Sequence, residues 1–339
     1  MSILQRFAPA LLLLIISPLI AEFLLGDFNV RQFAYLGIFI PLYGALALFV
    51  RELVRRSGRG WVSMLVMALV CGLIYEGLVN QTLFNPHFAG ADLLKYGYVE
   101  ALGTSFNYAA FILTLHTVWS ISTPIAIAEG FAGERAREPW LNRPLLAGTG
   151  LLALLGLAGT TASTIERYKF VSSPLQYGSV VVLILILTFL AFRIVRKPGF
   201  AEPSNTDDHG SKTWMVIVFA FALSSAFMIW FHYAPDHKIN SSIGLAVFLG
   251  IDVIALFFLS FWSRQASWNA THIVAAATGA VLTYTWFGLW RFVVDGKSAM
   301  GIKTEPIDIV GQVCLALALI GVCWLAIHRQ TNVRTGPKM

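Results

Sequence analysis

The segment "WVSMLVMALVCGLIYEGLVN", Trp61 to Asn80, decides the fold. No charged residue occurs in it before Glu76, which follows Trp61 by 15 residues. A helix needs about 20 mainly apolar residues to cross a bilayer, and this segment meets that length. We therefore predict a membrane span here, with a carboxylate near one of its ends.

The rest of the chain repeats this pattern. Of its 339 residues, 57% are hydrophobic and only 12% are charged, and the mean hydropathy is +0.71. A soluble domain has about 25% charged residues. We therefore predict an all-α integral membrane protein, a bundle of about ten transmembrane helices. The expected spans are 8–25, 33–50, 61–81, 104–128, 144–162, 178–196, 213–231, 242–260, 269–289 and 306–327. The first run also has the form of a signal peptide, and we interpret it as an uncleaved helix.

The Lys and Arg residues predict the orientation. The loops on the side of the N-terminus contain 16 of them, and the opposite loops contain 8. Because cytoplasmic loops carry the excess of Lys and Arg, both termini are expected in the cytoplasm. We therefore expect a multi-pass protein of a bacterial inner membrane. The net charge of +6 is spread over short loops and predicts no nucleic-acid partner.

One polar segment divides the chain. It is "RKPGFAEPSNTDDHGSK", Arg196 to Lys212, and its Pro, Gly and Ser content is typical of a linker. The predicted organisation is six helices plus four. The expected parts are a six-helix membrane domain over 1–197, a cytoplasmic linker over 198–212, a four-helix membrane domain over 213–328 and a cytoplasmic tail over 329–339.

The strongest basic cluster is the loop "VRELVRRSGRGW", Val50 to Trp61. Its four arginines are Arg51, Arg55, Arg56 and Arg59. Such a cluster is typical of a cytoplasmic topology anchor, and contact with anionic lipid is the natural extension. The bilayer is thus the predicted partner, and the sequence indicates no particular protein partner.

Motifs for common chemistries are missing from the sequence. It contains no GxxxxGK[ST], no HExxH and no GxSxG segment. Its histidines are not clustered, and Cys71, Cys314 and Cys323 lie singly in apolar runs, without metal-ligand spacing. We therefore predict no metal site and no cofactor.

Polar residues inside the spans mark the candidate site, since a charge at the bilayer centre costs about 2.5–3.5 kcal/mol. Glu76 is about 22 Å from the cytoplasmic face, and Asn80 follows it on the same helix face. The next span, running inward, places His116, Ser120 and Thr123 on one stripe. If this span begins near Asn107, Glu76 and His116 lie within about 5 Å in depth. We predict Glu76 and His116 as catalytic candidates.

Further candidates are assigned to substrate binding. They are Asn80, Gln81, Ser120, Asp252 and Glu22. Glu22 lies at a depth similar to that of Glu76, and Asp252 in "FLGIDVIALFF" lies close to the midplane. A Glu in a low dielectric can act as a general acid or base, and His can share that role. The alternative is that these groups only hold helices together through buried hydrogen bonds.

Two segments carry a resemblance. "YEGLVNQTLFNP" and "FILTLHTVWSISTPIA" resemble segments of a family of uncharacterised bacterial polytopic membrane proteins, over the first six spans. A Glu on one helix followed by a Phe-and-His helix is also similar to the CAAX-protease and bacteriocin-processing (CPBP) family. That similarity implies a Glu/His intramembrane protease. Tyr75 stands in place of the first Glu of its Glu-Glu motif, and Phe111 precedes His116 by five residues rather than four.

Three hypotheses for function remain open. The first is a membrane-embedded enzyme that uses Glu76 and His116 on a lipid, isoprenoid or peptide substrate, with hydrolase-type chemistry as one form. The second is a transporter or permease with a polar path through Glu22, Glu76, His116 and Asp252. The third is an accessory subunit of a membrane complex, in which the polar groups join helices. Contact between Glu76 and His116 is the geometric test of the first.

Overall fold

The computed structural model describes residues 3–194, 212–265 and 267–335. Ten of the described helical segments are long and apolar enough to cross a membrane, at Arg6–Leu24, Val30–Arg56, Trp61–Val79, Phe106–Arg137, Arg143–Tyr168, Pro174–Arg193, Thr213–Asp236, Ser241–Ser263, Ala270–Asp295 and Pro306–Gln330. The predicted ten spans and the all-α class are confirmed. The predicted linker 198–212 lies almost entirely outside the described residues.

The spans are built from α-helices with short 3₁₀- and π-helical segments. Span one comprises α1 (Ile3–Pro18) and η1 (Leu19–Leu24), and span two comprises η2 (Val30–Tyr35), α2 (Leu36–Phe39), η3 (Ile40–Ala45) and α3 (Leu46–Arg56). Span three comprises α4 (Trp61–Leu73) and η4 (Ile74–Val79). Span four comprises α5 (Phe106–Leu115), η6 (His116–Ser122), α6 (Thr123–Ala132) and η7 (Gly133–Arg137). The other six comprise α7 (Arg143–Tyr168), α8 (Pro174–Phe189) with η8 (Leu190–Ile194), α9 (Thr213–Asp236), α10 (Ser241–Ser263), α11 (Ala270–Trp290) with η9 (Arg291–Asp295), and α12 (Pro306–Thr335). Between spans three and four lie η5 (Phe88–Gly90) and the antiparallel strands β1 (Tyr98–Val99) and β2 (Thr104–Ser105).

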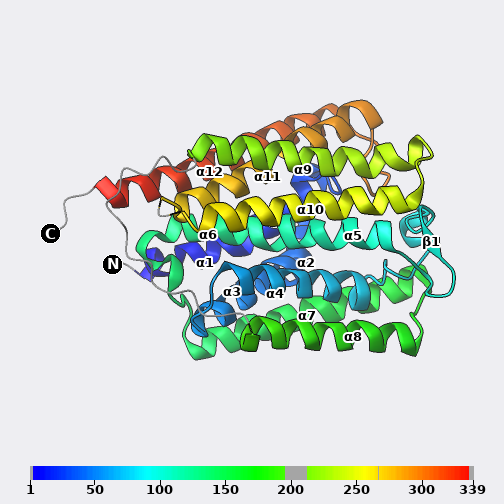
Figure 1. Ribbon diagram of the computed structural model, residues 1–339, viewed down its shortest axis with the longest axis horizontal. Coiled ribbons are helices and arrows are strands. Elements are labelled where there is room, and N and C mark those ends of the chain that lie inside the picture. Colours follow the sequence, from blue (N-terminus) through cyan, green and yellow to red (C-terminus); the bar gives the residue numbers. More distant parts are fainter. Residues whose placement is uncertain (1–2, 195–211, 266, 336–339) are drawn as a thin grey trace.

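The helices run roughly parallel along the long axis of the molecule (Figure 1). The start of α1 and the end of α12 lie at one end, and β1 lies at the opposite end. The distribution of Lys and Arg predicts that the end with β1 faces away from the cytoplasm. We call it the outer end.

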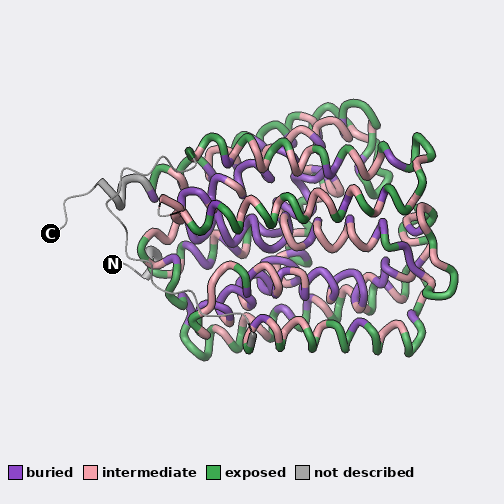
Figure 2. Tube along the Cα trace, viewed as in Figure 1, coloured by how far each residue is buried: buried purple, intermediate pink, exposed green. Residues whose placement is uncertain are grey.

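Five spans form the centre of the bundle. More than 60% of the most apolar stretch is buried in spans one, three, four and nine, and 50% in span two. The corresponding share is only 11–17% in spans five to eight. Figure 2 shows the same difference, with buried residues concentrated on the inner helices. Exposed leucines such as Leu154 and Leu185 stand on the outer helices, as expected for surfaces that face lipid tails.

Spans from both sides of the predicted linker share one hydrophobic cluster. It contains Ile20 from span one, Trp119 from span four, and Phe227, Val281 and Leu319 from spans seven, nine and ten. The division into a six-helix domain over 1–197 and a four-helix domain over 213–328 stays a prediction.

Two glycines let the central helices approach closely. A Cβ on Gly44 would lie 2.2 Å from the Leu14 carbonyl oxygen, and a Cβ on Gly288 would lie 2.2 Å from that of Leu24. Small residues at such crossings allow backbones to pack closely within a membrane. Spans two and nine are thereby held against span one, beside the residues described next.

Candidate functional site

Locally distorted helices deliver the polar side chains to the interior. Glu22 lies on η1, Tyr43 on η3, Glu76 on η4, His116 on η6 and Arg291 on η9, and all five segments are π-helical. A π-helical turn is rare, and it is often found at functional sites because it redirects side chains from the regular helix face. Five of the central spans are therefore locally distorted where they carry a polar group.

The Glu76 carboxylate meets the His116 ring. Its Oε1 lies 2.8 Å from His116 Nε2, and both residues are buried, at 3% and 4% exposure. Asn80 Nδ2 donates to the same oxygen at 3.2 Å, and the Thr82 hydroxyl donates to Oε2. Both carboxylate oxygens are thus hydrogen-bonded. The predicted contact between Glu76 and His116 is present in the structure.

The other ring nitrogen of His116 faces Ser120. Nδ1 lies 2.9 Å from Ser120 Oγ, one turn along the same span. With an ionised Glu76, Nε2 carries the ring proton and donates it to the carboxylate, while Nδ1 accepts the Ser120 hydroxyl proton. Ser120 is fully buried, and its carbonyl oxygen accepts from Ser17 Oγ at 2.8 Å. A line of hydrogen bonds therefore runs from Glu76 through His116 toward span one.

Two aromatic hydroxyls and a second acid border this pair. The Tyr43 and Tyr75 rings lie 6.2 and 5.0 Å from the His116 ring. Tyr75 Oη donates to the Leu42 carbonyl at 3.0 Å, while Tyr43 lies close to Glu22. Glu22 is 9% exposed and close enough to Glu76 for their charges to interact. Glu22 therefore belongs to the same polar cluster as the pair.

An ion pair stands at the outer edge of this cluster. Arg291 Nη1 lies 2.6 Å from Asp27 Oδ1, and both side chains are partly buried. Burial raises the pKa of the Asp27 carboxyl above its usual range, and the Arg291 guanidinium acts in the opposite direction. We define the outer cluster as Glu22, Asp27, Tyr43, Glu76, His116, Ser120 and Arg291.

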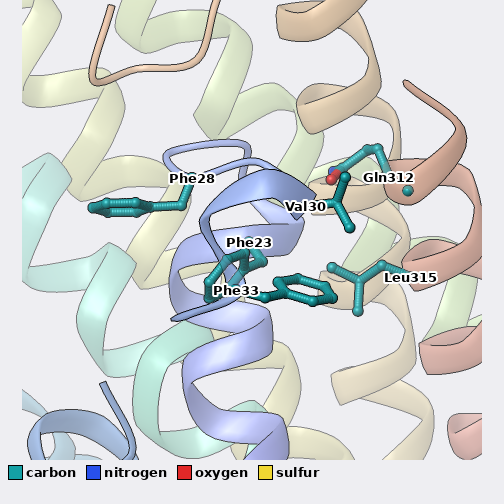
Figure 3. A pocket seen from close by; sticks show the side chains of 7 residues that line it. Phe23, Phe28, Val30, Phe33, Gln312 and Leu315 are labelled. Carbon is teal, nitrogen blue, oxygen red and sulfur yellow. The ribbon is translucent and has the colours of Figure 1, made fainter. Parts of the chain in front are cut away.

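A cleft lies close to the outer cluster. A cleft of about 560 Å³ at the outer end is lined in part by Asn107 and Tyr108, at the start of α5. Tyr108 is 5% exposed and lies close to Thr82, which itself donates to Glu76. Beside η1, by contrast, the apolar hollow between Phe23, Phe33 and Leu315 has no room for a water molecule (Figure 3). The cleft and the carboxylate are thus joined by two hydroxyls.

A second network of charges occupies the opposite end of the bundle. Arg55 donates to both oxygens of Glu129, at 2.7 and 2.5 Å, and Arg51 Nε donates to Glu129 Oε1 at 3.0 Å. Arg51 also donates to Glu52 at 2.6 Å, and its guanidinium lies 3.4 Å from the Trp140 ring centroid. Arg51, Glu52, Arg55 and Glu129 are all buried. We call these four residues the inner network.

The inner network corrects one expectation. Arg51 and Arg55 were predicted to contact anionic lipid, but they are 0% and 8% exposed and are bound to buried carboxylates. They are therefore not available to headgroups. The sequence pattern shows only that arginines are close together, and the paired Glu129 is contributed by a span far along the chain.

Two predicted site residues lie apart from the outer cluster. Asp252 Oδ2 accepts from Thr114 Oγ1 at 3.0 Å and is half-buried on α10. Gln81 Oε1 accepts from the Ser172 backbone at 2.7 Å, so Gln81 joins the loop before α8 to the end of span three. Glu22, Asn80 and Ser120, in contrast, lie beside the Glu76–His116 pair.

The sequence analysis did not identify several residues of the outer cluster or the two hydroxyls between it and the cleft. Tyr43 and Tyr108 are ordinary membrane-span aromatics by composition, and Thr82 lies in a turn. Arg291 and Asp27 stand at helix ends, where charges are common. A usable signal was the position of Asp27 and Arg291 at the outer ends of spans one and nine, at depths close to that of Glu76.

Together, the ten apolar helices and the buried polar cluster define an all-α, multi-pass membrane protein. More specifically, the chain belongs to an uncharacterized membrane protein family, whose model matches residues 11–334. The predicted resemblance to such a family is confirmed, and the match continues beyond the first six spans. No curated protein and no solved structure matches the chain.

Proposed function

We propose that the protein is a proton-coupled transporter of a bacterial inner membrane. The observation that carries this proposal is that two hydroxyls, those of Tyr108 and Thr82, lie between the outer cleft and the hydrogen-bonded Glu76–His116 pair. Ionisable groups inside membrane spans are typical of ion paths and proton relays. The π-helical segments that carry Glu76 and His116 are also of a kind often found at functional sites.

The chemistry of the pair suits proton exchange. A proton that arrives at Tyr108 passes through hydroxyls to the Glu76 carboxylate, which shares it with His116 Nε2. Protonation of Glu76 removes the negative charge that attracts His116, which weakens this hydrogen bond and changes the contact between spans three and four. Protonation of one buried carboxylate is thereby linked to helix packing, which a coupled transporter requires.

The third hypothesis, an accessory subunit, expects buried polar groups that are satisfied and remote from water. Both Glu76 oxygens are indeed hydrogen-bonded. The relay to the cleft is the feature that favours proton exchange over a purely structural role. Asp252, which accepts from Thr114, has no part in the proposed path.

Proton exchange at Glu76 is tested by infrared difference spectroscopy of the full chain in nanodiscs during a pH step. We expect a protonated-carboxyl band that disappears in Glu76→Gln and stays in the control Glu134→Gln, since Glu134 is exposed. In deuterated buffer, the band should exchange more slowly in Tyr108→Phe. Exchange at the wild-type rate in Tyr108→Phe would contradict the relay.

Transport is tested in liposomes that contain the protein and the pH dye pyranine. External amines, amino acids, carboxylates and sugars are added in turn. We expect one class to change the internal pH, with the response lost in Glu76→Gln and retained in Glu134→Gln. If no class changes the internal pH, transport is excluded as the use of this site.

A membrane-embedded enzyme is the second candidate. The specific observation in its favour is the acid Glu22 near Glu76, which supplies the second carboxylate that the CPBP-like pattern lacks at Tyr75. Glu76 would then be the general base that activates water beside His116. Cleavage of a prenylated peptide or a lipid by the purified protein, lost in both Glu76→Gln and Glu22→Gln, would establish this candidate.

We also propose that the two remaining arginines of the basic loop meet anionic headgroups. Arg56 is exposed and Arg59 is half-buried, unlike Arg51 and Arg55. Basic residues near an anionic leaflet contribute about 1 kcal/mol each. Wild-type protein in detergent should therefore bind more strongly to liposomes that contain phosphatidylglycerol than to liposomes without it. This difference in binding should be smaller in the Arg56→Gln, Arg59→Gln double variant.

A further inference from the structure

The outer cleft contains a buried polar atom without a partner. Asn107 is 5% exposed, and its Nδ2 donates to the Ser241 carbonyl at 3.0 Å, but its Oδ1 has no hydrogen-bond partner. A buried acceptor that lacks a donor costs about 1–3 kcal/mol. Because Asn107 lines the cleft, a ligand that donates a hydrogen bond there would satisfy it.

The walls of the cleft are aromatic. Phe248 is 1% exposed, and Phe231 stacks on Phe111 with ring centroids 3.5 Å apart. Tyr96 and Tyr108 line the same cleft. These rings come from α5, α9, α10 and the loop before β1, so they form a surface that four separate segments hold in place. Such a surface suits the apolar body of a small ligand, and aromatic faces attract cations.

The rim of the cleft carries more negative than positive charge. Asp92 and Asp236 are exposed acids, Lys95 is the lysine among the lining residues, and the half-buried His232 also lines the cleft. A positively charged ligand is therefore favoured over an anion. It would place its ammonium near the two carboxylates and an N–H at Asn107 Oδ1.

We infer that the outer cleft binds a small aromatic or aliphatic amine in its ammonium form. The same cleft contains Tyr108, the first hydroxyl of the line that leads to Glu76. An ammonium ion beside Tyr108 disfavours a second positive charge on the relay, so occupation of the cleft and protonation of Glu76 oppose each other. As the substrate class of a transporter, this inference rests on the proposed function, whereas binding itself rests on the cleft alone.

The experiment measures binding of phenethylammonium to the full chain in nanodiscs by tryptophan fluorescence. Trp230 is a suitable reporter because its Nε1 donates to the Gly244 carbonyl at 3.1 Å, beside the cleft. We expect saturable binding, at least tenfold weaker in Asn107→Leu and in Asp236→Asn. Benzyltrimethylammonium, which lacks an N–H, should bind more weakly than phenethylammonium, and phenylacetate should not bind.

Equal binding of phenylacetate and phenethylammonium would overturn the inference, as would wild-type affinity in both variants. Gly244→Ala is a second variant that leaves the cleft charges intact. Its Cβ would lie 2.2 Å from Tyr96 Oη and 2.8 Å from Asn107 Oδ1, so it should shift both side chains and abolish binding. Unfolding midpoints of each variant check that the fold is kept.

Glu76→Gln separates this inference from the proposed function. Phenethylammonium should still bind to it, while the pH response in pyranine-loaded liposomes disappears. Binding without any pH response in the wild type would contradict the transporter and leave the amine site standing. A pH response to another class of compound, without amine binding, would contradict the amine site and leave the transporter standing.

Discussion

The inner network and the outer cluster place buried charges in the same bundle in two different ways. In the inner network, Glu129 is held by Arg51 and Arg55, so each charge faces an opposite one within 3.0 Å. In the outer cluster, Glu76 is held by neutral groups and by a histidine that can exchange a proton. Fully paired fixed charges fasten helices, whereas a carboxylate held by a titratable partner can change state at modest cost.

Access to water separates the two regions further. The inner network is closed off by the Trp140 ring, which covers the Arg51 guanidinium. The outer cluster is joined through Thr82 and Tyr108 to a cleft. The first therefore has the properties of a structural clamp, and the second those of an exchange site. Four variants test this contrast.

The largest effect is expected from Glu129→Ala in the inner network. It would leave Arg51 and Arg55 with an uncompensated buried charge, which costs about 3–5 kcal/mol of folding free energy. The measurement is unfolding in mixed micelles by titration with SDS. Glu134→Ala on the adjacent exposed turn is the control and should unfold like the wild type. An unchanged midpoint in Glu129→Ala would show that the inner network is not a clamp.

A smaller effect on stability is expected from Glu76→Gln in the outer cluster. The amide oxygen still faces His116, but the NH₂ group cannot accept from Thr82, so the loss should be about 1–3 kcal/mol. The same titration gives the value. A loss as large as that of Glu129→Ala would mean that the two regions have the same structural role, and would remove the contrast.

Ser120→Ala should have a still smaller effect. It removes the hydroxyl that faces His116 Nδ1 but keeps the Cβ atom, so the expected loss of folding free energy is about 1 kcal/mol. The sharper measurement is the His116 tautomer by ¹⁵N NMR, since Nδ1 loses its partner while Nε2 keeps Glu76. A shift in the Nε2 resonance equal to that of Nδ1 would show that the Glu76 contact depends on Ser120.

The smallest effect is expected from Asp27→Asn, and it concerns pH. Burial raises the pKa of Asp27 in the folded protein, so the native state binds this proton more tightly than the unfolded chain does. The contribution of Asp27 to stability is therefore full below about pH 4, the ordinary value for Asp, and declines as pH rises through the native pKa. SDS titrations between pH 4 and 8 should show a flatter dependence in Asp27→Asn, and an equal slope would contradict this.

The class of the protein and the number of its spans follow from the order of the residues alone. Runs of about 20 apolar residues must form helices in a bilayer, because no water is available there for the backbone. The same reasoning selects Glu76 and His116, since a charged group among apolar residues is costly wherever the helices pack. These features are local, so a single sequence suffices to predict them.

The partners of each polar residue depend on how the helices pack. Arg51 and Arg55 form a basic cluster in the sequence, but Glu129, from another span, makes them buried and paired. Asp252 is predicted from the sequence to lie close to the midplane, and in the structure it accepts a hydrogen bond from Thr114 and makes none with the outer cluster. Tyr43, Thr82 and Tyr108 gain their roles only where distant segments pack them beside Glu22 and Glu76. Helix rotation and depth are fixed by contacts between distant segments, and a pattern read along one segment contains no information about them.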